Sequence, residues 1–158
     1  MQMNKRADSS VSLHPLIADR WSPRAYDESA TMSGEDLTAI FEAARWAPSA
    51  FNAQPWKFIL GLRGDENFKL ITSVLVPFNQ EWASRASALV LTNVIGFRED
   101  GTENQTAMYD TGLAVSLMTV EANHRGYDVH QMSGFDHAAA KAKFPLGAGI
   151  EPVTCIAI

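Results

Sequence analysis

The stretch Ser87 to Ile95 constrains the fold of this chain more than any other. It is a nearly unbroken apolar run of strand length, too short to cross a membrane as a helix. Such a run is typical of a strand at the centre of a sheet, because both faces of that strand are covered by other elements. We therefore expect one sheet with helices packed on both of its faces.

Helical spacing, capping residues and turn residues predict the remaining elements. The sequence Ser33-Gly-Glu-Asp36 is a capping box ahead of a helix, and Gly126 is placed to end the longest helix. About four or five strands are expected in the sheet. The predicted helices are a short one near Leu13–Ile17, then 37–46, 66–73, a short piece within 76–82, 104–125 and 136–144, and the further strands are 56–62, 128–132 and 153–158.

The helix expected at 104–125 is apolar over most of its circumference, and small residues such as Gly112, Ala114 and Ser116 lie on more than one side. A helix of this kind is buried on several faces. Two arrangements satisfy that requirement, namely the central helix of a monomer or a helix packed against a copy of itself.

Composition narrows the class of protein. The 158 residues predict a single domain over residues 11–158 behind a disordered, polar N-terminus at residues 1–10. That N-terminus lacks the apolar core of a signal peptide, so a cytoplasmic protein with no membrane partner is expected. A net charge of −5 argues against nucleic-acid binding. Cys155 is the only cysteine and the four histidines share no metal-ligand spacing, so no metal is expected.

The stretch Ala43 to Phe58 predicts a helix, a fixed loop and a strand. Pro48 and Pro55 bracket the loop, and proline restricts its own φ and favours extended geometry in the residue before it. Within the loop lie Ser49, Asn52 and Gln54, whose hydroxyl and amide groups can bind a flat heterocycle with alternating C=O and N–H edges. The simpler interpretation is that the loop only connects two elements.

The segment Arg20-Trp-Ser-Pro-Arg-Ala-Tyr26 places Arg20, Ser22 and Arg24 at alternate positions. If the segment is extended, these three side chains project to one side and form a local positive site in an acidic protein. Paired surface arginines can also simply be solvated.

These two stretches, followed by Asn79-Gln80 and by Met132-Ser-Gly-Phe-Asp136, resemble the FMN-dependent nitroreductase family over about Leu13 to Ile158. The resemblance implies an α+β, three-layer fold with a mixed, mostly antiparallel sheet. It also implies a homodimer with the cofactor at its interface. Relatives continue past the last strand into an extension that wraps the partner subunit, and we expect this extension to be absent here.

The resemblance also implies the roles of single residues. Arg20 and Ser22 would meet the phosphate and ribityl end of FMN, beside Trp21, and Arg24 would stabilise the N1/O2 edge of the ring. Pro48, Ser49, Ala50 and Asn52 of the partner subunit would cover the ring. The remaining ring contacts would come from Asn79, Met132 and the backbone of Ser133 and Gly134.

The activity implied is that of an oxidoreductase. NADH or NADPH would pass a hydride to flavin N5, and a nitroaromatic or quinone would then take the electrons in a ping-pong reaction. The chemistry belongs to the flavin, so no acid or base side chain is required. Two alternatives stay open: a flavin-binding protein without turnover, and a superfamily enzyme with other chemistry, such as reductive dehalogenation.

Overall fold

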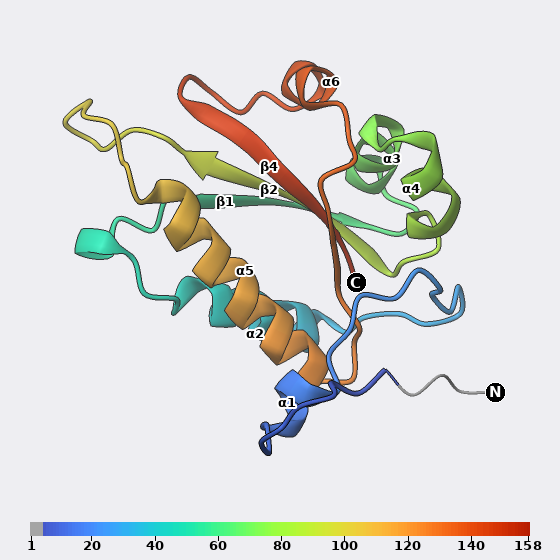
Figure 1. The fold of residues 1–158 in the computed structure, drawn as a ribbon. Helices are drawn as coiled ribbons and strands as arrows, with labels where there is room; N and C mark the ends of the chain where they lie inside the picture. Colours follow the sequence, from blue (N-terminus) through green and yellow to red (C-terminus); the bar gives the residue numbers. More distant parts are fainter. Residues whose placement is uncertain (1–4) are drawn as a thin grey trace.

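A four-stranded antiparallel sheet forms the middle layer of the molecule (Figure 1). The computed structural model describes residues 5–158. The strands are β1 (Trp56–Leu62), β2 (Ala88–Ile95), β3 (His130–Met132) and β4 (Ile150–Ala157), arranged in the order β1-β2-β4-β3. The predicted α+β class is confirmed, and every pairing of the named strands is antiparallel rather than mixed.

Strand β2 lies inside the sheet, as its apolar sequence predicted. Leu91 pairs with Ile59 of β1 on one side and with Cys155 of β4 on the other. All residues of β2 except Ile95 are buried. The register against β4 shifts between Thr92 and Asn93, where a β-bulge bends the strand.

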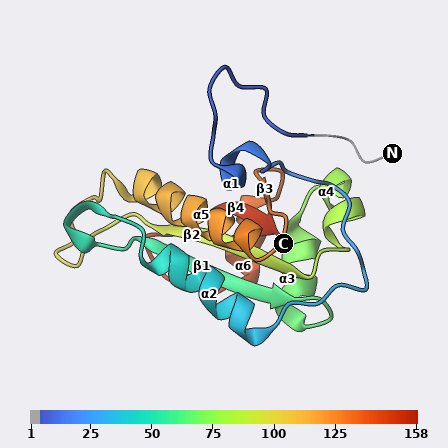
Figure 2. The same cartoon turned by 90° about the horizontal axis from the view of Figure 1, so that it is seen from below.

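Helices α2 (Gly34–Arg45) and α5 (Ala107–His124) cover one face of the sheet. Figure 2, viewed from this side, shows the two helices next to each other. Ile40 of α2 and Met118 of α5 are fully buried and form one core with Val90 and Ile156 of the sheet. Burial of such side chains contributes roughly 1.5–3 kcal/mol each, so this layer is a main source of stability.

Helices α3 (Glu66–Val74), α4 (Pro77–Ala83) and α6 (His137–Lys143) pack on the other side of the sheet. Ile71 and Leu89 are fully buried there. Gly61 of β1 permits this packing, because a Cβ atom at this position would lie 2.3 Å from the backbone nitrogen of Phe68 in α3.

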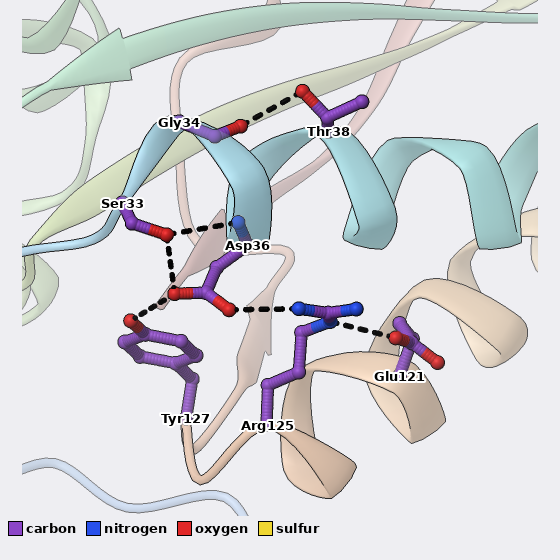
Figure 3. Close-up of polar contacts among 7 residues, drawn as sticks. All are labelled: Ser33, Gly34, Asp36, Thr38, Glu121, Arg125 and Tyr127. Carbon is purple, nitrogen blue, oxygen red and sulfur yellow. Dashed lines mark hydrogen bonds and ion pairs between the residues drawn. The ribbon is translucent and has the colours of Figure 1, made fainter.

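The predicted cap of α2 belongs to a larger polar network (Figure 3). Ser33 Oγ accepts the backbone N–H of Asp36 at 3.0 Å, as a capping box requires. The carboxylate of Asp36 then accepts bonds from Arg125 at 2.9 Å and from the hydroxyl of Tyr127 at 2.9 Å, and Arg125 also pairs with Glu121. The first turn of α2 is therefore joined to the C-terminal end of α5.

The N-terminal part of the chain leads into the short helix α1 (Pro15–Ala18). Residues 5–10 form neither helix nor strand, and the backbone N–H of Ala7 donates to the carbonyl of Ala18 at 2.7 Å. The first four residues of the segment predicted to be disordered lie outside the described residues.

Candidate functional site

The segment from Arg20 to Tyr26 lies against the β3 edge of the sheet. His130 of β3 donates its Nδ1–H to the carbonyl of Pro23 at 2.7 Å; a carbonyl oxygen can only accept, so Nδ1 carries the proton. The ring of Tyr26 stacks on Trp82 of α4 with centroids 6.2 Å apart, and its hydroxyl donates to Ala157 O at 3.2 Å. Burial, with the nearby Asp128 carboxylate, raises the pKa of Tyr26. These contacts fix the backbone that carries the two arginines.

Both arginines of this segment are exposed. Arg20 donates to Ser22 Oγ at 3.4 Å, and the guanidinium of Arg24 lies 5.3 Å from the ring of Phe78. Within residues 5–158, neither guanidinium forms an ion pair with a carboxylate. Each is therefore free to bind an anionic group with charge-assisted hydrogen bonds.

A second group of polar atoms lies where β3 turns toward α6. Asn79 Nδ2 and the backbone N–H of Val76 both donate to the carbonyl of Gly134, each at 3.0 Å. A Cβ atom at Gly134 would lie 2.7 Å from Asn79 Nδ2, so a larger residue here would force the Asn79 side chain to move. The backbone N–H groups of Ser133 and Gly134 have no acceptor among residues 5–158, and they remain available to a ligand.

Two further predicted site residues differ in how accessible they are. The side chain of Met132 is 4% exposed and packs in the core, so only its backbone could contact a ligand. Trp21 is half-buried, and Lys5 Nζ lies 5.6 Å from its ring centroid.

The loop that follows α2 has an unusual backbone. Phe51, Asn52 and Gln54 adopt φ angles of 55°, 56° and 46°, and Ala50–Asn52 form the 3-10 turn η1. A left-handed residue other than glycine costs roughly 1–2 kcal/mol, and such strain is concentrated at functional sites.

The extended geometry expected of Gln54 ahead of Pro55 is therefore wrong. The loop closes on itself instead, because the backbone N–H of Gln54 donates to Ser49 Oγ at 3.1 Å. Gln54 Nε2 also donates to Asn52 Oδ1 at 3.1 Å.

Large side chains of this region face solvent. Phe51 is 90% exposed with the guanidinium carbon of Arg98 5.2 Å from its ring centroid, and Trp46 at the end of α2 is also exposed. A hollow of about 600 Å³ lies between this loop and the loop after β2, lined by Phe51, Phe97 and Arg98 among others.

The two predicted halves of the site come from opposite ends of the molecule. Figures 1 and 2 both show η1 at one end of the sheet and α4 at the other. Arg24 contacts Phe78 of α4, and the neighbouring Asn79 binds the carbonyl of Gly134, so these residues lie in one region along the β3 edge. Arg20 and Ser22 precede Arg24 on the same segment. The loop with Pro48, Ser49, Ala50 and Asn52 contains η1 and lies at the opposite end of the sheet. Within the described chain the two groups do not meet.

Three residues that support these two groups were not identified from the sequence. His130 and Tyr26 hold the arginine segment, and Asp110 of α5 accepts the backbone N–H of Ala50 at 3.1 Å. For Asp110 a signal was available, because it is a carboxylate within an otherwise apolar stretch of helix.

Comparison with known proteins identifies the family. The sequence model described as the nitroreductase family matches residues 17–86. A solved structure described as an oxidoreductase containing FMN is 33% identical to this chain. The match covers 99% of this chain and 80% of the other, and the two superpose with a TM-score of 0.90. The chain belongs to the nitroreductase family.

Other proteins match over shorter stretches. An uncharacterized 15.4 kDa protein of Mycolicibacterium smegmatis is 34% identical over 113 residues, which are 65% of this chain and 73% of that protein. An oxygen-insensitive NADPH nitroreductase of Helicobacter acinonychis is 36% identical over 76 residues, 48% of this chain and 35% of that protein.

Within residues 5–158, no three His, Cys, Asp or Glu side chains are grouped so that they could hold a metal ion. In the same range, no helix combines the length and the apolar character needed to span a bilayer.

Proposed function

We propose that this nitroreductase-family protein is an FMN-dependent oxidoreductase that uses NADH or NADPH to reduce nitroaromatic or quinone-type acceptors. The observation that carries the proposal is a set of donors along the β3 edge: two guanidinium groups that pair with no carboxylate of residues 5–158, the Ser22 hydroxyl, and the backbone N–H groups of Ser133 and Gly134, which have no acceptor in the same range. FMN needs such a set, because it presents a phosphate, a hydroxylated chain and a ring edge rich in acceptors. The full-length likeness to an FMN-containing oxidoreductase supports the same cofactor.

Each group has a role that follows from its chemistry. Arg20 and Ser22 bind the phosphate and the ribityl chain, and the charge of Arg20 is not neutralised by any carboxylate of residues 5–158. Arg24 places positive charge at the pyrimidine edge of the ring, where negative charge develops on reduction. Asn79 and the N–H groups of Ser133 and Gly134 complete the ring contacts. Bound FMN supplies the hydride-accepting chemistry.

The proposal includes a homodimer in which Pro48, Ser49, Ala50 and Asn52 of one chain cover the cofactor held by the other. Their loop contains η1, which lies at the far end of the sheet from α4, whereas Arg24 contacts Phe78 of α4; this separation supports the arrangement. Exposed apolar residues of α5 support it too, since Met108, Tyr109 and Leu117 are exposed with Gly112 and Ser116 on the same helix. Exposed apolar side chains along one helix are typical of a protein interface.

Absorbance tests the function directly. Purified protein reconstituted with FMN should be yellow, lose its flavin absorbance with NADH or NADPH under anaerobic conditions, and regain it when a nitroaromatic or a quinone is added. Yellow protein that is never bleached would instead be a flavin-binding protein without turnover. Protein that retains no FMN after reconstitution would contradict the proposal.

A further inference from the structure

The loop that would cover the cofactor is held in a conformation that its own sequence does not favour. Phe51, Asn52 and Gln54 are left-handed although none is glycine. A strained backbone of this kind persists only where the surrounding structure determines it. The two bonds within the loop, from the N–H of Gln54 to Ser49 and from the Gln54 amide to Asn52, close the turn but do not attach it to the fold.

The attachment is made by α5. The backbone N–H of Ala50 donates to Asp110 Oδ2 at 3.1 Å, between residues that are 60 positions apart in the sequence. The hydroxyl of Thr106 also lies 3.0 Å from this oxygen, and it shares its proton between Asp110 Oδ2 and Asn104 Oδ1, which is 3.1 Å away. Arg98, whose guanidinium lies near the Phe51 ring, is exposed and belongs to a surface loop, so it is a weaker support.

Burial distinguishes Asp110 from an ordinary acidic residue at a helix start. Its side chain is in the first turn of α5, where a negative charge is favourable, but an exposed carboxylate would serve the helix equally well. Asp110 is only 3% exposed, and within residues 5–158 no lysine or arginine pairs with it. Burying an unpaired carboxylate is costly unless hydrogen bonds compensate, and one of its two bonds goes to the loop.

We propose that Asp110 is a positioning residue for the flavin site: its carboxylate fixes the Pro48–Gln54 loop so that Ala50 and Asn52 are presented to the cofactor of the partner chain. The expected effect on cofactor binding rests on the proposed function. The attachment of the loop to α5 does not, because it concerns the chain without ligand. The two parts can be tested separately.

The test uses Asp110→Ala and Asp110→Asn in the full chain. Amide hydrogen exchange of residues 49–54 is measured on the FMN-free protein, and FMN affinity is measured by fluorescence titration. With Asp110→Ala, the loop amides should exchange at least roughly tenfold faster, and the Kd for FMN should rise roughly 10- to 100-fold, as for one lost hydrogen bond to a charged group. With Asp110→Asn both effects should be smaller, because the amide oxygen can still accept the bond.

Asp65→Asn is the matched control. Asp65 also accepts two backbone N–H groups, from Leu62 at 2.8 Å and from Phe68 at 2.7 Å, but it caps α3 and touches neither the loop nor α5. Asp65→Asn should lower Tm, while loop exchange and FMN affinity stay as in the wild type.

Two results would overturn the inference. One is Asp110→Ala with wild-type loop exchange and wild-type FMN affinity. The other is an Asp65→Asn variant that lowers Tm as much as Asp110→Ala does and also loses as much FMN affinity. Both substitutions would then act through general destabilisation. Wild-type protein that binds no FMN would contradict the proposed function instead, and the exchange rates would still decide whether Asp110 holds the loop.

Discussion

The carboxylate of Asp36 binds the guanidinium of Arg125 at 2.9 Å and so connects two helices that are distant in the sequence (Figure 3). The hydroxyl of Ser33 is the largest cause that lowers the pKa of Asp36 to about 2, followed by Arg125 and the hydroxyl of Tyr127. A carboxylate whose pKa is lowered in the folded state stabilises that state above its ordinary pKa of 3.8. This contribution is lost as the pH falls from about 4 toward 2.

Asp36→Asn should therefore lower Tm at pH 7 by a few degrees. The difference from the wild type should shrink as the pH falls toward 2, because the wild-type carboxylate then becomes neutral as well. Thermal unfolding followed by circular dichroism across this pH range checks the prediction. Glu35→Gln is the control, since it removes an exposed charge from the same first turn of α2. A difference in Tm that persists undiminished at low pH would show that the charge of Asp36 is not its source.

Substitution of Arg20 and of Arg24 should change different properties of the bound flavin. Arg20→Ala should raise the Kd for FMN by roughly 10- to 100-fold, for a loss of about 1.5–3 kcal/mol in a charged hydrogen bond to the phosphate. Arg24→Ala should mainly lower the reduction potential of the bound flavin, by roughly 30 mV for each 1.4 kcal/mol of lost stabilisation of the reduced ring.

Titration of the apo-protein and spectroelectrochemistry measure these two effects. Arg85→Ala is the control, because Arg85 pairs with Glu28 at the surface and carries no role in the site. Wild-type affinity and potential in both site variants would show that the assignment of the arginines is wrong.

The sequence predicted local features of this fold better than long-range ones. The cap at Ser33 and the burial of β2 were predicted correctly, because each depends on neighbouring residues or on a pattern along one strand. The partners of Asp36 were not, since Arg125 lies 89 residues away. The left-handed φ of Gln54 contradicts the local preference ahead of a proline, and bonds within the loop and to α5 override that preference.

Gly134→Ala tests the close approach of the β3 turn to α4. The added methyl group would lie 2.7 Å from Asn79 Nδ2 and 3.0 Å from a methyl group of Val76, so Asn79 must move away from the Gly134 carbonyl. We expect a loss of about 1 kcal/mol in stability, as for one hydrogen bond, and weaker FMN binding because Asn79 is displaced.

Chemical denaturation measures the stability of Gly134→Ala, and FMN titration measures its affinity. Asn79→Ala should reproduce the loss of affinity if the displaced amide is its cause, and a Gly134→Ala variant with wild-type affinity would argue against a role for Asn79.

Gly112→Ala gives opposite results for a monomer and for a dimer packed through α5. Gly112 is exposed in the single chain, and apart from its own stretch of helix backbone a Cβ atom there would meet no atom of residues 5–158 within 4 Å. In a monomer the change should raise stability by about 0.5–1 kcal/mol, because alanine favours a helix interior over glycine. In a dimer whose α5 helices meet at Gly112, the methyl group instead separates the two chains, so dimer dissociation should increase and FMN should be lost with it.

Sedimentation velocity at several protein concentrations measures the dissociation. Gly34→Ala serves as the control, because Gly34 is an exposed glycine in the first turn of α2. Stabilisation by Gly112→Ala with no change in oligomeric state would contradict an interface at this point of α5.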